Sequence, residues 1–313
     1  MSISGTIDTN ITGIINKIES LSGEVEGKLV LYFVKKGRTN NYSAYKPSIS
    51  GELQEELLKL IVSSLKEIKD MDTTDFNPIG SLDETLETCN YDYVESLNDI
   101  LESTLDKLLP NPPENLSEFS FYLIKIKFDT NSENDFLCFR RVTKFKNLQK
   151  GIVGKIFNNE FVKISSDLIG IDSFLDIIGY DKKLTIANHI SMERIFDIKA
   201  QYEENAKRTL ELIKNTGMID NFDDFYNDSI SDGRSIRGLT KILKDPERVN
   251  QVHENFEKVV ELVANMELEI NFNEDKTKMI YENKSQLQKM TFILRDAYYQ
   301  TFIIERKGLD ELA

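Results

Sequence analysis

The stretch that decides the fold is EFSFYLIKIKFDTNSENDFLCFRRVTKF, residues 118–145. Its two halves, 118–130 and 134–145, are rich in aromatic and β-branched side chains, a composition typical of buried strands. The polar run NSEN at 131–134 between them is typical of a hairpin turn. We therefore predict two strands joined by a tight turn in the middle of the chain.

The residues before this hairpin alternate between helical and strand-like patterns. Apolar side chains recur at helical spacing in 52–70, and KLVLYFVKK at 28–36 has a strand-like composition. The segment PNPP at 110–113 interrupts the pattern, because proline lacks the backbone N–H that both kinds of element need. We place a domain boundary there, between an N-terminal α/β subdomain, 1–110, and a mixed α/β domain, 114–313.

The residues after the hairpin predict another strand pair and several helices. SFLDIIGY and KLTIAN form the strand pair, with a turn at 181–183. Helical spacing covers 191–215, 233–244, 246–265 and 285–296. The acidic stretches 71–90 and 220–232 are expected to be irregular. The fold class is therefore mixed α/β: a subdomain of helices and strands, followed by a mixed-sheet domain with flanking helices.

Positive charge is concentrated in one part of an acidic chain. The formal net charge is −14, yet residues 121–163 carry nine Lys and Arg against four Asp and Glu. An acidic protein repels a polyanion at long range, so any contact with nucleic acid must come from a local patch.

The cysteine content and the absence of a long apolar run favour a cytoplasmic location. Two cysteines, Cys89 and Cys138, without a CxxC or Cys/His cluster predict neither a disulfide framework nor a zinc site. No targeting segment is recognisable, and no run approaches the ~18 apolar residues of a membrane span. We expect a cytoplasmic protein that reaches a membrane only through a partner.

Two groups of cations are candidates for binding DNA. In 137–163 cations are interleaved with Phe139, Phe145 and Phe157; phosphates could bind the former, and bases could stack on the latter. On the predicted helix 233–244 the cations are spaced three or four residues apart, so that they share one face. The candidate DNA-binding residues are Arg140, Arg141, Lys144, Lys146 and Lys150, together with Arg234, Arg237, Lys241 and Lys244. In the alternative interpretation, the phenylalanines belong to the core and the cations are simply solvated.

Catalytic motifs are scarce. Glu269 in a predicted strand, with Glu282 and Lys284 at the end of another, resembles the restriction-enzyme pattern in which carboxylates hold Mg²⁺ and a lysine positions water. Such a pattern is common by chance in a chain with this many charges. The two histidines, His189 and His253, lie in no recognisable motif. The sequence therefore favours a protein that is not an enzyme and needs no metal or cofactor, with a Mg²⁺-dependent nuclease as the alternative.

Two segments carry a family resemblance. FLDIIGYDKKLTIANHISMERIFDIKAQYEENA at 174–206, including Asp176 and the run Ile186-Ala187-Asn188, resembles the KwaB family of the bacterial Kiwa anti-phage system. LRDAYYQTFIIERKG at 294–308 is similar to the same family. The family supplies no individual DNA-binding residues.

The resemblance implies a cytoplasmic homo-oligomer that binds phage DNA without strong sequence preference. It also implies a transmembrane KwaA-like subunit that recruits the protein to the inner membrane, and a block of phage replication and transcription. A third possibility is an interaction subunit that does not bind DNA, whose basic patches meet an acidic protein surface.

Overall fold

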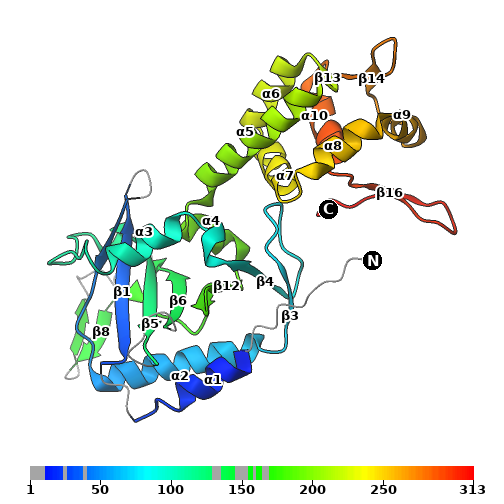
Figure 1. Cartoon of the computed structure of the whole chain (residues 1–313). Helices are drawn as coiled ribbons and strands as arrows, with labels where there is room; N and C mark the ends of the chain where they lie inside the picture. The colour runs from blue at the N-terminus through cyan, green and yellow to red at the C-terminus, as the bar shows by residue number, and fades with distance from the viewer. Residues whose placement is uncertain are drawn as a thin grey trace. The chain divides into compact units, whose positions relative to one another are not determined.

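The computed structural model divides the chain into two compact units (Figure 1). Unit 1 comprises Met1–Phe76 and Leu82–Ile198, and unit 2 comprises Asn77–Ser81 and Lys199–Ala313. The structure describes residues 11–23, 27–37, 41–128, 135–144, 154–157, 160–163 and 169–313. The boundary predicted at 110–113 lies inside unit 1, because strands on either side of it pair with each other.

Unit 1 is built on an eight-stranded sheet with the order β2-β1-β5-β6-β11-β12-β4-β3. Neighbouring strands are antiparallel except β3 and β4, which are parallel. The bounds are β1 Leu29–Lys36, β2 Tyr42–Tyr45, β3 Asp72–Asp75, β4 Thr85–Asn90, β5 Phe119–Ile126, β6 Phe136–Arg141, β11 Ile177–Tyr180 and β12 Lys183–Ile186. The pairing of β5 with β6 confirms the two predicted strands, whereas the predicted turn at 131–134 lies outside the described residues.

Helices cover both faces of this sheet (Figure 1). One face carries α1 (Ile11–Glu19) and α2 (Gly51–Ile68), and the other carries α3 (Ser96–Ser103) and α4 (His189–Ile195). Two short 3₁₀ turns, η1 (Tyr91–Tyr93) and η2 (Leu116–Glu118), lie between these elements. Because successive strand residues point to opposite faces, a sheet covered on both sides needs nearly continuous apolar strands. This requirement explains the composition of the central hairpin.

The two layers of core follow from that alternation. Ile124, Cys138 and Ile178 belong to the apolar cluster under α1 and α2. On the opposite face the ring of Phe139 lies 5.3 Å from that of Phe196. Helix α2 begins where the side chain of its N-cap, Ser50, accepts a hydrogen bond from the backbone of Leu53.

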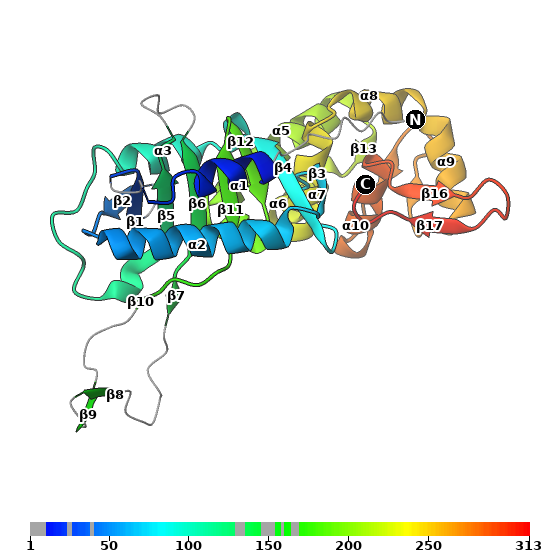
Figure 2. The same cartoon turned by 90° about the horizontal axis from the view of Figure 1, so that it is seen from below.

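Between β6 and β11 the chain leaves the eight-stranded sheet and forms two short strand pairs (Figure 2). At the base of this segment, β7 (Thr143–Lys144) pairs antiparallel with β10 (Ile169–Gly170). Between them, β8 (Gly154–Phe157) pairs antiparallel with β9 (Glu160–Lys163). We call residues 142–170 the basic excursion, because they contain five lysines and a single acidic residue before Asp167.

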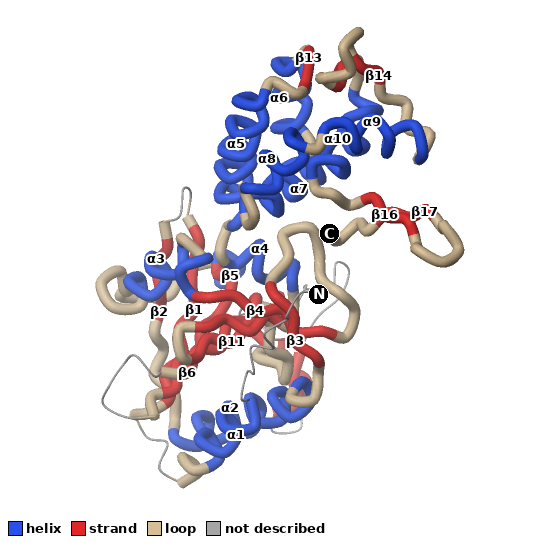
Figure 3. The backbone as a smooth tube through the Cα atoms, turned by 45° about the vertical axis from the view of Figure 1, so that its right-hand side comes forward, coloured by secondary structure: helices blue, strands red, loops and turns tan. Residues whose placement is uncertain are grey.

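Unit 2 is mainly helical (Figure 3). Its helices are α5 Ile198–Thr216, α6 Phe222–Ser231, α7 Gly233–Leu243, α8 Glu247–Glu254, α9 Phe256–Asn265 and α10 Leu287–Leu294, with a 3₁₀ turn η4 at Lys284–Gln286. A small sheet joins β13 (Ile219–Asp220), β15 (Met279–Ile280) and β14 (Asn271–Phe272), and β16 (Tyr298–Gln300) pairs with β17 (Lys307–Leu309). A Cβ atom at Gly238 would lie 2.9 Å from Thr291, so glycine allows α7 to approach α10 closely.

Several predicted elements differ from the structure. The stretch 71–90 contains β3 and β4 rather than a loop, and 220–232 contains α6, whose first turn carries Asp223 and Asp224. Acidic side chains there stabilise the positive end of the helix dipole, so they favour the helix. The helix predicted at 191–215 is divided into α4 and α5, with Asp197 at a φ of 53° between them.

Candidate nucleic-acid interface

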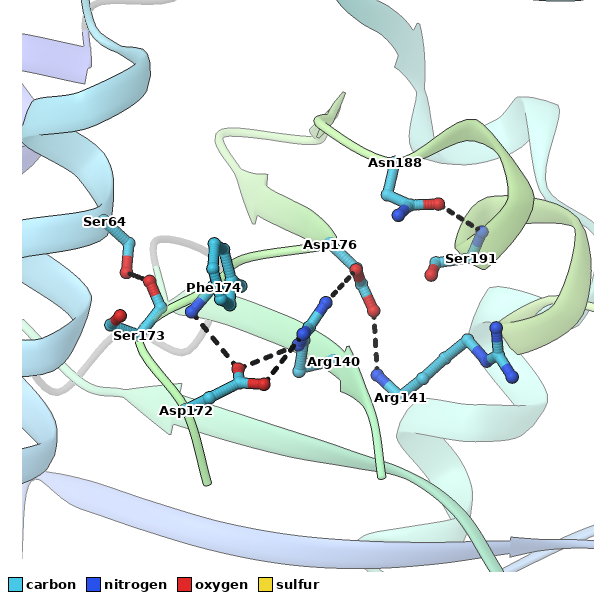
Figure 4. Close-up of polar contacts among 9 residues, drawn as sticks. All are labelled: Ser64, Arg140, Arg141, Asp172, Ser173, Phe174, Asp176, Asn188 and Ser191. Atoms are coloured by element: carbon cyan, nitrogen blue, oxygen red, sulfur yellow. Dashed lines mark hydrogen bonds and ion pairs between the residues drawn. The ribbon is translucent and has the colours of Figure 1, made fainter. Parts of the chain in front are cut away.

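Asp176 directly precedes β11, and its side chain bonds to the end of β6 (Figure 4). It is fully buried, and its Oδ1 accepts a hydrogen bond from Nη1 of Arg140 at 2.6 Å. Its Oδ2 accepts one from the backbone N–H of Arg141 at 2.9 Å. Its backbone carbonyl accepts the N–H groups of Ala187 and Asn188 at 2.9 and 3.1 Å. One residue therefore connects the end of β6, the start of β11 and the end of β12.

Arg140 has a second carboxylate partner in Asp172. Its Nε and Nη2 donate to the two oxygens of Asp172 at 3.0 and 2.8 Å, which is the bidentate geometry that guanidinium groups favour. The ring of Phe174 lies 5.4 Å from the guanidinium carbon. Burial by itself lowers the pKa of Arg140, but the hydrogen bonds and charges of the two carboxylates outweigh it and raise this pKa.

This Arg140 cluster, made of Arg140, Asp172 and Asp176, connects the two ends of the basic excursion. Arg140 lies on the outgoing strand, and the two carboxylates lie on the returning segment. The guanidinium group of Arg140, a predicted DNA-binding residue, therefore forms ion pairs with two carboxylates of the same unit. The Arg140 side chain is only 18% exposed, and its ion pairs join the outgoing and returning ends of the excursion.

Arg141 points the other way. Successive strand residues alternate, so its side chain extends away from Arg140, towards the face that carries α4 (Figure 4). It is half-buried, and its backbone is fixed by Asp176. Of the other candidates in this region, Lys144 pairs with Ile169 through the backbone of β7, whereas Lys146 and Lys150 lie outside the described residues.

The aromatic residues of this region do not form one group. Phe139 is fully buried against Phe196, so the alternative interpretation, in which it belongs to the core, is correct for this residue. Phe145 lies outside the described residues, and the structure gives Phe157 only as a backbone position in β8.

Part of the segment 174–206, which carries the family resemblance, lies beside the Arg140 cluster, because the backbone N–H groups of Ala187 and Asn188 bond to Asp176. Asn188 is the N-cap of α4, where its Oδ1 accepts the backbone N–H of Ser191 at 2.9 Å (Figure 4). The next residue, His189, places Nδ1 2.7 Å from a carboxylate oxygen of the buried Glu87, and its ring stacks on Phe76 at 5.2 Å. Sequence reasoning missed Asp172 and Glu87, because an isolated carboxylate gives no pattern that separates an internal partner from a solvated one.

The second predicted group of cations lies on α7 in unit 2. Ile236, Leu239 and Ile242 are buried, which confirms a helix with an apolar face. Arg234 and Lys244 are exposed, whereas Arg237 and Lys241 are half-buried. The structure therefore divides the predicted row of cations into outer residues and residues that lie against the rest of unit 2.

The residues of the nuclease alternative each hold a different polar partner. Glu269 pairs with Lys289 at 2.9 Å, and that hydrogen bond lowers the pKa of Glu269. Glu282 accepts a hydrogen bond from Asn271 at 3.0 Å, and Lys284 lies 3.4 Å from Ser231. Within the described ranges, no group of three His, Cys, Asp or Glu residues is arranged to hold a metal ion.

The fold and the site describe a mixed α/β protein with a lysine-rich excursion whose base is held by a buried ion-pair cluster. Residues 116–303, more than half of the chain, match the family model described as Kiwa protein KwaB-like. The chain belongs to this family, and it is therefore a component of the Kiwa anti-phage defence system of bacteria. No curated protein and no solved structure shows significant similarity to the chain. None of the helices in the described part of the chain is long and apolar enough to cross a membrane.

Proposed function

We propose that the protein is a defence effector that binds phage DNA without strong sequence preference and thereby blocks its replication and transcription. The observation that carries this proposal is the basic excursion, whose two ends are joined by the Arg140 cluster. Membership of the KwaB-like family supports a role in defence. Binding alone is sufficient for such a block, so the proposal requires no catalytic residue.

The chemistry of the excursion suits the DNA backbone. Lys144, Lys146, Lys150, Lys155 and Lys163 are accompanied by Glu160 as the only acidic residue between 136 and 166. Lysines bind phosphates and release condensed counterions, and this contribution does not depend on base sequence. Secondary contacts in this proposal are Arg141, the outer α7 cations Arg234 and Lys244, and the half-buried Arg237.

Affinity for duplex DNA is expected to fall steeply with salt. If the five lysines of the excursion each contact a phosphate, the logarithm of the binding constant should fall against the logarithm of salt concentration with a slope of about −4 to −5. Fluorescence anisotropy with two duplexes of unrelated sequence would measure this slope. Equal slopes and affinities support phosphate binding, whereas a slope near zero on both duplexes contradicts it.

We further propose that a transmembrane KwaA-like subunit binds the β16–β17 hairpin. At its tip Phe302, Ile303 and Ile304 are 100%, 90% and 73% exposed. Three adjacent apolar side chains at this exposure are unusual on a free surface and typical of a contact site. The hairpin lies in 294–308, one of the two segments that resemble the family.

Substitution of the hairpin tip tests this contact. The test uses cells that also produce a tagged membrane subunit, which is purified in detergent. Phe302→Ser/Ile303→Ser is expected to lower the amount of the protein that co-purifies with this subunit at least fivefold, because the apolar contact is lost. Leu82→Ser/Leu105→Ser, which removes two other exposed apolar side chains, is the matched control. Unchanged recovery of the hairpin variant contradicts the contact, and conversion of an isolated oligomer into a monomer would assign the tip to a second copy of the chain.

A further inference from the structure

Unit 2 contains a cavity that the proposed DNA binding does not use. Residues from α7, α8, α9 and α10, together with segments near 295 and 313, line a solvent-open cavity of about 660 Å³. Small-molecule sites have volumes of about 300–1,000 Å³. The size of the cavity therefore fits a ligand the size of a nucleotide.

Three cations from different elements line this cavity. Lys241 comes from α7, Arg248 from α8, and Arg295 follows α10. Arg295 is only 3% exposed, yet its hydrogen-bond acceptors are backbone carbonyls of Glu311 and Ala313 at 2.7–3.0 Å. Lys241 likewise lies 3.4 Å from a backbone carbonyl, that of Leu312. The backbone carbonyls of Glu311 and Leu312 satisfy N–H groups of Arg295 and Lys241 but carry no formal charge.

The surroundings of Arg295 and Lys241 favour their charged forms less than the surroundings of Arg140 do. Two carboxylates raise the pKa of Arg140, whereas burial lowers the pKa of Arg295 to about 10, and the charges of Asp310 and Glu311 offset that lowering only in part. The charge of Arg248 lowers the pKa of Arg295 further. Burial also lowers the pKa of Lys241, and the neighbouring cations add to the effect. An anion in the cavity would stabilise all three charged groups.

The acidic residues of the cavity balance its cations only in part. Asp245 and Asp296 line it, and Asp245 lies 3.4 Å from Nη2 of Arg248. With Lys258 the lining contains four cations against these two carboxylates, in a chain whose net charge is −14. The excess of positive charge is therefore a local property of this cavity.

The rest of the lining suits a flat heterocycle. Val252, Leu262 and Ile293 provide an apolar wall, and Gln251 and Asn255 add side-chain amides at its edge. Apolar walls with a few placed polar groups are the usual environment of a bound ring system. Phosphates at the cations and a base at the apolar wall would together fill both parts of the cavity.

We propose that this cavity binds a nucleotide through its phosphate groups, with Lys241, Arg248 and Arg295 as the phosphate-binding residues. The proposal goes beyond DNA binding and does not depend on it. The ligand class is a phosphorylated molecule with one aromatic base, because the cavity offers cations on one side and apolar side chains on the other.

Calorimetry with ATP on the full chain tests the proposal, with inorganic tripolyphosphate as a second probe. Lys241→Gln/Arg248→Gln is expected to weaken ATP binding at least tenfold and to abolish the rise in melting temperature that ATP causes. Arg295 is left intact, because its burial makes its loss a threat to folding. Lys207→Gln/Arg208→Gln removes the same charge from exposed positions on α5 and should bind ATP like the unmodified chain.

The outcomes separate three possibilities. ATP bound more tightly than tripolyphosphate, with loss in the cavity variant only, supports the proposal. Failure of ATP to bind at millimolar concentration overturns it, as does equal binding by both variants. Displacement of tripolyphosphate by 5′-phosphorylated but not by 5′-hydroxyl oligonucleotides, without binding of ATP, also overturns it and assigns the cavity to strand ends. Reversal of the charges in the basic excursion should leave ATP binding intact, so failure of the DNA proposal would be visible separately.

Discussion

Replacement of Asp176 with alanine is expected to lower the free energy of unfolding of unit 1 by about 3–5 kcal/mol, the range for loss of one partner of a buried ion pair. The carboxylate is fully buried, and its removal leaves Nη1 of Arg140 and the backbone N–H of Arg141 without their acceptors. Urea titration followed by hydrogen exchange of β5 and β6 peptides would measure this loss in unit 1 alone.

Two further variants separate the buried pair from ordinary surface charge. Asp172→Asn should cost less than Asp176→Ala, because the Asp172 side chain is 34% exposed whereas that of Asp176 is 1% exposed. In Arg140→Met/Asp176→Leu no buried charge is left unpaired, so the double variant should be more stable than Asp176→Ala. Equal stability of Asp176→Ala and the unmodified chain would show that the Arg140 cluster does not hold the excursion.

The central hairpin and α2 could be predicted because their signals are local. Strands buried on both faces need continuous apolar runs, and residues 118–145 supply them. An amphipathic helix needs apolar residues at 3.6-residue spacing, and α2 buries Leu57, Leu58, Ile61 and Leu65 in that order.

The elements that escaped prediction depend on contacts between distant residues. β4 carries the buried Glu87, which is stable in the core because His189, more than one hundred residues later, lies 2.7 Å away. The position of the division between the units could not be found either, since proline at 110–113 ends local structure without separating β1 from β5.

The candidate site shows the same limit. The distribution of charge along the sequence identifies the basic excursion, but it does not distinguish a paired cation such as Arg140 from Lys144. Only the fold brings Asp172 and Asp176 to Arg140, and the sequence pattern gives no sign of this pairing. The α7 cations divide for a similar reason, because Lys241 lies against the cavity of unit 2 whereas Arg234 is exposed.

Reversal of the five lysines of the basic excursion to glutamate is expected to weaken binding of duplex DNA by at least about 10³-fold at low salt, since each lost phosphate contact removes its share of counterion release. The salt slope should fall by about one for each lysine that contacts a phosphate. The substituted residues are Lys144, Lys146, Lys150, Lys155 and Lys163. Anisotropy titration across a range of salt concentrations measures both quantities.

A matched control is needed because five reversals change the net charge by ten and would weaken DNA binding through long-range repulsion alone. Reversal of five exposed lysines elsewhere, Lys59, Lys69, Lys199, Lys207 and Lys214, produces the same change in net charge. If binding depends on local phosphate contacts, the control should lose far less affinity and keep the original salt slope. If both variants lose affinity equally, the basic excursion is not the DNA contact, and the outer α7 cations become the next residues to reverse.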